Sequence, residues 1–155
     1  MQNYTLSLLL FLCIAPFAMS QKLEKSELPK EVSASFQKSH PGHFPYEWKY
    51  VRKKNAYKAY FITEGKKYKS YFKPNGDWIY AKSKMAKEEL PEKIWKHYYE
   101  SEWFDWKLKK TQIRLTPDCG TIYILNVKRG KKSNKEKIKL IYTEKGTFLK
   151  SQKKY

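Results

Sequence analysis

Two short stretches of the chain carry apolar residues at every fourth position. Residues 28–36 read LPKEVSASF and residues 90–98 read LPEKIWKHY, and in both the first, fifth and ninth residues are apolar or aromatic. Residues with this spacing lie on one face of an α-helix, and a proline at the second position suits the first helical turn. Helices of about a dozen residues are marginal alone in water, so we expect each to dock its apolar face on a sheet.

Polar and aromatic residues alternate in the segments that follow the first predicted helix. Four runs show the period of two and the aromatic enrichment that are typical of strands: 46–50, 56–63, 67–73 and 77–82. Turn residues separate the last three runs, and the Asn-Gly pair at 75–76 suits the positive φ angles of a tight hairpin. We therefore predict a meander of four short strands.

The segments after the second predicted helix match the first half in order. YKAYF at 57–61 corresponds to YILNV at 123–127, and FKPNGDWI at 72–79 corresponds to YTEKGTFL at 142–149. The extra residues of the second half fall in loops, as expected of a structural duplication. The sequence thus predicts an α+β fold of two tandem αββββ repeats, each a helix packed on a four-stranded antiparallel meander. Repeat one spans about residues 28–83, the linker residues 82–89, and repeat two about residues 90–151.

The chain begins with a segment that is typical of export. Residues 1–20 contain no charged side chain, residues 6–17 form an apolar run of secretory length, and small residues precede Gln21. A transmembrane anchor is the alternative, but the apolar run is short for one. We expect a signal peptide at 1–20 and a mature domain at 21–155 that is periplasmic or secreted and has no transmembrane segment.

The mature part is strongly basic. The chain holds 33 Lys and Arg against 15 Asp and Glu, for a formal net charge of +18, and every charged residue lies after position 20. Such a charge attracts anionic partners, which for an exported protein means the envelope surface, a polysaccharide or an acidic protein. The alternative interpretation is a lysine-rich surface that keeps the protein soluble.

The sequence offers little catalytic chemistry. Cys13 would leave with the signal peptide, and it follows a leucine where a lipoprotein needs a small residue, so Cys119 remains alone and no disulfide is expected. His40 and His43 flank a Pro-Gly turn without a further ligand, which argues against a metal site. No G-x-S-x-G, Walker or H-E-x-x-H motif occurs. We therefore predict no catalytic residue, no metal and no cofactor, and a protein that is not an enzyme.

Several of these motifs resemble a known family. The L-P-x-x-[VI]-x-x-x-[FY] helices, the Y-x-[AL]-x-[FV] strands and the [FY]-x-x-x-G-x-[WF]-[IL] hairpins, together with strands at Trp48 and Trp106, resemble bacterial PepSY-like proteins. That family looks like the β-lactamase-inhibitor protein (BLIP) in fold. The resemblance covers residues 28–151 and implies an extracytoplasmic protein with a non-enzymatic binding function, one form of which is inhibition of a peptidase or another enzyme. The high lysine content and the lack of paired cysteines argue against inhibition of a β-lactamase.

Alternation along the strands sorts the side chains onto two faces. We assign the more apolar set to the helices: Tyr57, Ala59, Phe61, Tyr68, Ser70, Phe72, Tyr123, Leu125, Val127, Ile138, Leu140 and Tyr142. The opposite face interleaves tyrosine with lysine, and tyrosine offers a large contact area at low entropic cost. We predict that a partner binds there, at Lys58, Tyr60, Ile62, Lys69, Tyr71, Lys73, Asn126 and Lys139. The alternative is cross-strand packing that serves the sheet alone.

Two functions follow from this face. The first is a non-enzymatic exported module that binds an extracytoplasmic protein or peptide. The sequence decides neither the identity of this partner nor whether binding inhibits it. The alternative is an envelope-associated protein that holds anionic polysaccharide or lipid headgroups by charge, and that salt would release steeply. Nucleic-acid binding fits the charge and the aromatic residues, but export argues against it, and an enzyme ranks last.

Overall fold

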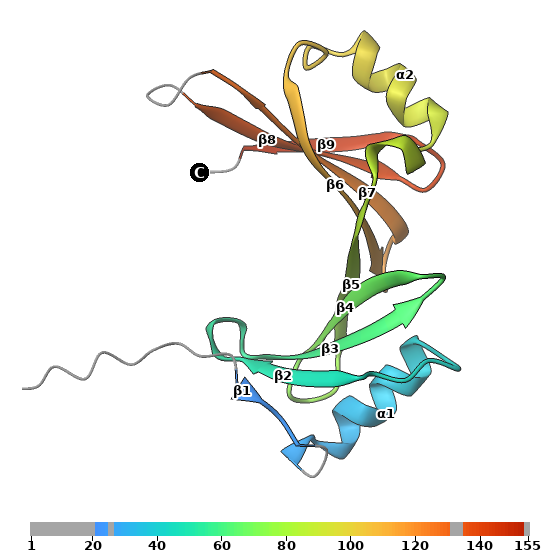
Figure 1. Ribbon diagram of the computed structural model, residues 1–155, viewed down its shortest axis with the longest axis vertical. Coiled ribbons are helices and arrows are strands. Elements are labelled where there is room, and N and C mark those ends of the chain that lie inside the picture. Colours follow the sequence, from blue (N-terminus) through green and yellow to red (C-terminus); the bar gives the residue numbers. More distant parts are fainter. Residues whose placement is uncertain (1–20, 25–26, 131–134, 154–155) are drawn as a thin grey trace, which may run out of the picture.

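One antiparallel sheet with two α-helices on its outer side makes up the described part of the chain (Figure 1). The computed structural model describes residues 21–24, 27–130 and 135–153. The signal peptide that we predict at residues 1–20 lies outside the described residues.

The elements follow one another in a simple order. The helices are α1 (Lys30–Ser39) and α2 (Glu92–Glu100), with short 3-10 helices η2 (Arg52–Lys54) and η3 (Lys87–Glu89). The strands are β1 (Gln21–Lys22), β2 (Glu47–Val51), β3 (Ala56–Thr63), β4 (Lys66–Phe72), β5 (Trp78–Met85), β6 (Lys107–Thr116), β7 (Gly120–Arg129), β8 (Glu136–Thr143) and β9 (Phe148–Lys153). The strands predicted at 56–63 and 67–73 are confirmed as β3 and β4.

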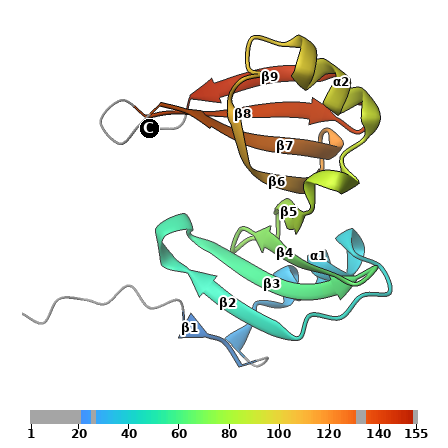
Figure 2. The same ribbon diagram turned by 45° about the horizontal axis from the view of Figure 1, so that its top comes forward.

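The prediction of two tandem αββββ repeats is wrong. All nine strands belong to one sheet in the order β1 to β9, which Figure 2 shows from bottom to top, so neither helix has a four-stranded meander of its own. The sheet is continuous because β5 pairs with β6 from Ala81–Leu115 to Met85–Thr111. Residues 82–85, which we placed in the linker, continue β5 and supply most of this pairing. The α+β composition remains, with one sheet in place of two.

Two apolar clusters hold the helices on the same face of the sheet. The cluster under α1 contains Val32, Phe36, Trp48, Ala59, Phe61, Tyr68, Phe72 and Ala81. The cluster under α2 contains Leu90, Ile94, Tyr98, Trp103, Trp106, Leu125, Val127, Leu140 and Tyr142. The assignment of the more apolar strand residues to the helices is therefore confirmed.

Phe36 lies at the centre of the first cluster. Its side chain is 1% exposed, and its ring centroid lies 5.4 Å from that of Phe61, 5.7 Å from that of Trp48 and 6.1 Å from that of Phe72. All three ring pairs are tilted or edge-on, and aromatic pairs of this geometry stabilise a core beyond their buried area. This one helical residue therefore joins α1 to three strands.

His40 is a buried polar residue at the end of α1. It is 5% exposed, its Nε2 lies 2.9 Å from Ser70 Oγ, and the same Oγ accepts a hydrogen bond from Trp78 Nε1 at 2.9 Å. Burial, with a smaller contribution from His43, lowers the pKa of His40 from 6.5 to about 4. The histidine is therefore neutral in the folded protein at neutral pH and belongs to the core.

We expect acid to weaken the fold through His40. Because its pKa is lower in the folded state, the unfolded chain binds the proton more tightly, so stability is lost as the pH falls from about 6.5 towards 4. The full pKa difference corresponds to about 3 kcal/mol, of which about 2–3 kcal/mol is lost between pH 6.5 and 4, because the titration is incomplete at both ends of that range. Urea unfolding at a series of pH values measures this loss.

A matched pair of variants separates His40 from the other titrating groups. His40→Leu should flatten the fall in unfolding free energy between pH 6.5 and 4 relative to the unsubstituted protein. His43→Gln, directly after the Pro41-Gly42 turn, removes only the smaller contribution to the pKa shift and should keep most of that fall. An equally steep fall in His40→Leu would contradict the assignment.

Candidate functional site

The sheet face that turns away from the helices lies on the inner side of the sheet's curve. Figure 1 shows the sheet curved into a C, with α1 and α2 outside the curve and the other face inside it. We call the side chains on this inner side the concave face. The strand register defines it, because directly paired residues of neighbouring strands point to the same side.

Register arranges the concave face into rows that cross the sheet. One row runs Lys49, Lys58, Tyr71 and Tyr80 from β2 to β5. The next row starts at Glu47 and Tyr60 and continues, on β4, β5 and β6, through three cations: Lys69, Lys82 and Arg114. We call these three residues the cation row.

Lysines surround the ring of Tyr60. The Nζ atoms of Lys58, Lys69 and Lys49 lie 4.8, 5.3 and 5.8 Å from its centroid. Contacts of this kind are worth about 0.5–1 kcal/mol each at exposed sites. They fix the ring and the lysine stems on the strands before any partner arrives.

A second cluster is built around the adjacent rings of Tyr71 and Tyr80, whose centroids are 4.8 Å apart. Lys82 Nζ lies 5.3 and 5.6 Å from the two centroids, and Arg114 Cζ lies 4.6 Å from that of Tyr80. Lys54, from η2, donates a hydrogen bond to the Tyr80 hydroxyl at 3.2 Å and lies 4.9 Å from the Tyr71 centroid. Three cations thus gather on two tyrosines.

Positive charge on this face is poorly compensated. Among the paired strand residues that the structure describes there, Glu47 is the one carboxylate, and it forms an ion pair with Lys49 at 3.0 Å. Desolvation, followed by the charges of Lys54 and Arg114, lowers the pKa of Lys82 to about 8. Burial raises the pKa of Tyr71 to about 12. The centre of the face is therefore a desolvated, cationic surface.

The structure brings some of the predicted site residues together. Lys58, Tyr60 and Lys69 are neighbours on the concave face. Asn126 and Lys139 pair with each other on the same face but lie on β7 and β8, beyond β5 and β6. They belong to the other half of the curve.

Three predicted residues have different surroundings. Ile62 is 52% exposed and pairs with Lys67 near the end of β3. Tyr71 points to the concave face but is only 7% exposed, because cations cover its ring. Lys73 lies in the hairpin after β4, where it forms an ion pair with Asp77 at 3.1 Å.

Sequence reasoning missed four residues of the second cluster: Lys54, Tyr80, Lys82 and Arg114. Tyr80 and Lys82 alternate in the predicted run 77–82 and could have been placed beside Tyr71 by parity. Arg114 needed the β5–β6 pairing, and Lys54 lies in a 3-10 turn that has no strand period. Their position depends on contacts between elements.

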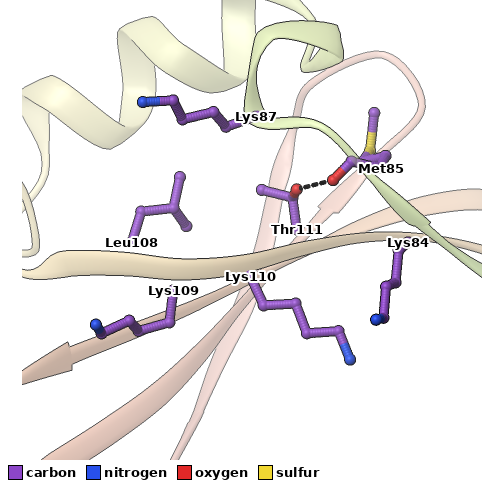
Figure 3. A pocket seen from close by; sticks show the side chains of 7 residues that line it. All are labelled: Lys84, Met85, Lys87, Leu108, Lys109, Lys110 and Thr111. Atoms are coloured by element: carbon purple, nitrogen blue, oxygen red, sulfur yellow. Dashed lines mark hydrogen bonds between the residues drawn. The ribbon is translucent and has the colours of Figure 1, made fainter.

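Two lysine-lined pockets lie beside these rows. The first, of about 450 Å³, opens between the end of β5 and the start of β6, where the register shifts between Leu108 and Lys110. In Figure 3, Lys84, Lys109 and Lys110 project to one side of the strands, and Lys87 and Leu108 to the other. The second pocket, of about 430 Å³, shares two of these lysines and is lined by Lys109, Lys110, Asn126, Val127, Lys128, Lys135, Lys137 and Ile138.

Other kinds of site find no support in the described ranges. Residues 21–24, 27–130 and 135–153 contain no group of three or more His, Cys, Asp or Glu side chains that could hold a metal ion. Cys119 is exposed and is not part of a disulfide. No helix in these ranges is long and apolar enough to cross a membrane.

Solved structures of similar shape come from Bacteroides. A BLIP-like protein from Bacteroides fragilis NCTC 9343 matches with a TM-score of 0.66 and 20% identity, over 81% of this chain and 85% of that one. The fold is BLIP-like. A DUF2874 family protein from Bacteroides ovatus ATCC 8483 shares this BLIP-like fold with a TM-score of 0.65 and 20% identity, over 81% and 86% of the two chains.

A third structure is a candidate periplasmic protein from Bacteroides eggerthii DSM 20697, with a TM-score of 0.60 and 23% identity over 81% of this chain and 88% of that one. No family model matches the chain, and no curated protein matches it. The likeness to BLIP that the sequence motifs imply is thus confirmed at the level of the fold, whereas membership of the PepSY-like family stays a prediction.

Proposed function

We propose that this BLIP-like chain is a non-enzymatic exported module that binds an extracytoplasmic protein or peptide on its concave face. The observation that carries the proposal is the array of tyrosines and uncompensated cations on that face, where Glu47 is the one described carboxylate among the paired strand residues. A desolvated array of one charge sign favours a partner with the opposite sign.

The packing of the array supports binding. Tyr60 and its lysines are held against one another on rigid strands, so little side-chain freedom is lost when a partner arrives. The fold neighbours include a BLIP-like protein and a candidate periplasmic protein, and both support an exported binding protein.

A second candidate function has an observation of its own. The pockets around Lys109 and Lys110 gather lysines from β5, β6, β7 and β8, an arrangement suited to the anionic groups of an envelope polysaccharide or lipid headgroup. Such binding would rest on charge and would weaken steeply with salt.

A charge-reversed concave variant tests the proposal. We expect Lys58→Glu/Tyr60→Ala/Lys69→Glu to lose capture of an envelope partner, because it removes a half-buried ring of the concave face and reverses two charges beside it. Affinity capture from an envelope extract, followed by identification of the retained protein, measures this at about 50 mM and about 300 mM salt.

A matched variant on the outer side serves as the control. Lys38→Glu/Tyr99→Ala/Lys96→Glu removes a 64% exposed tyrosine and the same net charge from α1 and α2, and it should keep the partner. Equal capture by both variants would contradict the proposed function. Release of polysaccharide or lipid at moderate salt, with no protein retained, would favour the second candidate.

A further inference from the structure

The cation row places three like charges directly opposite one another. Lys69, Lys82 and Arg114 are register partners on adjacent strands, which lie about 4.8 Å apart. Like charges at such positions destabilise a sheet. Among the described residues, none of the ion pairs involves any of the three. The tyrosine rings offset part of this repulsion, but no carboxylate among the described residues forms an ion pair with the row.

Two further observations indicate an incomplete site. Arg114 Nε is buried and has no hydrogen-bond partner among the described residues, although buried donors are nearly always paired. Lys82 is desolvated, and its pKa is lowered to about 8 by that burial and by the cations around it. Groups with such unfavourable surroundings gather where a protein binds a ligand.

We propose that the cation row binds a carboxylate-bearing segment of an acidic protein or peptide. This inference rests on the proposed function and names the chemistry of the partner. Carboxylates suit the row because ammonium and guanidinium groups donate charge-assisted hydrogen bonds to them. Arg114 is already stacked on Tyr80, which holds its guanidinium in place for such a contact.

The tyrosine rings favour a peptide over a sugar chain. Aromatic side chains that bind sugars offer a free ring face, whereas Lys58 and Lys69 lie over Tyr60, and Lys54, Lys82 and Arg114 lie over the Tyr71–Tyr80 pair. Because cations cover these rings, the groups that the row offers to a partner are the N–H donors of its lysines and arginine, which suit an anionic segment.

Binding at the row should be coupled to a proton on Lys82. The groups that face it are Lys54 from η2, Lys69 and Tyr71 from β4, Tyr80 from β5, and Lys110 and Arg114 from β6. A bound carboxylate favours the ammonium form and raises the pKa of Lys82 from about 8. Affinity should therefore fall as the pH rises through about 8, and complex formation there should take up a proton.

A dye-labelled octaglutamate peptide is the probe. We expect Lys82→Met/Arg114→Leu to bind it at least about tenfold more weakly, whereas Lys38→Met/Lys96→Met, which loses the same charge from the two helices, should stay within about twofold. Fluorescence anisotropy gives the affinities, and calorimetry in two buffers at pH 8.5 gives the proton uptake. Circular dichroism checks that each variant is folded. If Lys82→Met/Arg114→Leu does not fold, Lys82→Gln/Arg114→Gln takes its place in the same measurement.

Stability provides an independent readout. Because Lys82 is half-buried among cations, Lys82→Met should leave Tm unchanged or raise it while it weakens binding. A lower Tm with unchanged octaglutamate affinity would indicate a structural role and overturn the proposal.

The remaining outcomes also discriminate. Equal weakening of octaglutamate binding in both double variants would mean that only net charge matters, which overturns the proposal. Binding of dextran sulfate or of phosphatidylglycerol vesicles that requires Lys82 and Arg114, without any binding of octaglutamate, would also overturn the proposal. The ligand would then be a polysaccharide or a membrane. If Tyr60→Ala alone loses partner capture while octaglutamate binding is unchanged in Lys82→Met/Arg114→Leu, the proposed function stands and this inference fails.

Discussion

Phe36→Ala should lower the free energy of unfolding by about 3–5 kcal/mol, because truncation of a buried phenylalanine removes its transfer free energy and leaves a cavity. The ring is 1% exposed and contacts aromatic residues of β2, β3 and β4. Domains of this size have a total stability of about 5–15 kcal/mol, so the variant should lose a large share of it. Urea denaturation monitored by tryptophan fluorescence measures the change, since Trp48 lies beside the ring.

Phe44→Ala is the matched control. This phenylalanine follows α1 and is 78% exposed, so its truncation should cost less than about 0.5 kcal/mol. A similar loss in the two variants would mean that α1 is not held on the sheet through Phe36.

Gly76→Ala should cost about 3 kcal/mol. Gly76 has φ of +90°, where an L side chain is strained by about 1–2 kcal/mol. A Cβ atom there would also lie 2.9 Å from the backbone oxygen of Glu31, in the first turn of α1. The β4–β5 hairpin would have to move away from the helix, and such overpacking costs about 1–3 kcal/mol more. The midpoint of thermal or urea unfolding measures the loss.

Gly65→Ala isolates the contribution of the contact. This glycine lies in the β3–β4 hairpin with φ of +70°, and nothing would lie within 4 Å of its added Cβ. Its substitution should cost only the backbone strain, about 1 kcal/mol. If the two alanine variants lost the same free energy of unfolding, the contact between the hairpin and α1 would not contribute to stability.

Local pattern predicted the elements of this fold well but not how they join. Alternation placed β3 and β4, and the apolar spacing placed the two helices, because each pattern reflects burial along a single element. The β5–β6 pairing was missed because Lys82 and Lys84 make the end of β5 look like a polar linker. Both lysines point to the concave face, so the polar residues at the end of β5 mark the second face of a strand and not a linker.

The candidate site shows the same limit. Parity identified the face with Lys58, Tyr60 and Lys69, but it could not show that Tyr71 is covered, since Lys54 reaches it from a different element. Arg114 became a neighbour of Lys82 only through pairing between strands that are separated by a helix in the sequence. Such contacts depend on the tertiary structure and have no local signature.

The open sheet has a consequence for self-association. Its order ends at β9, so in the described part of the chain that strand has a neighbour on one side only. An unpaired strand edge invites a second molecule to add its own strand, and proteins discourage this with charged side chains, lysine above all. Lys150 and Lys153 lie on β9. Part of the lysine excess of this chain thus lies where it opposes aggregation, at the margin of the sheet and away from its central rows.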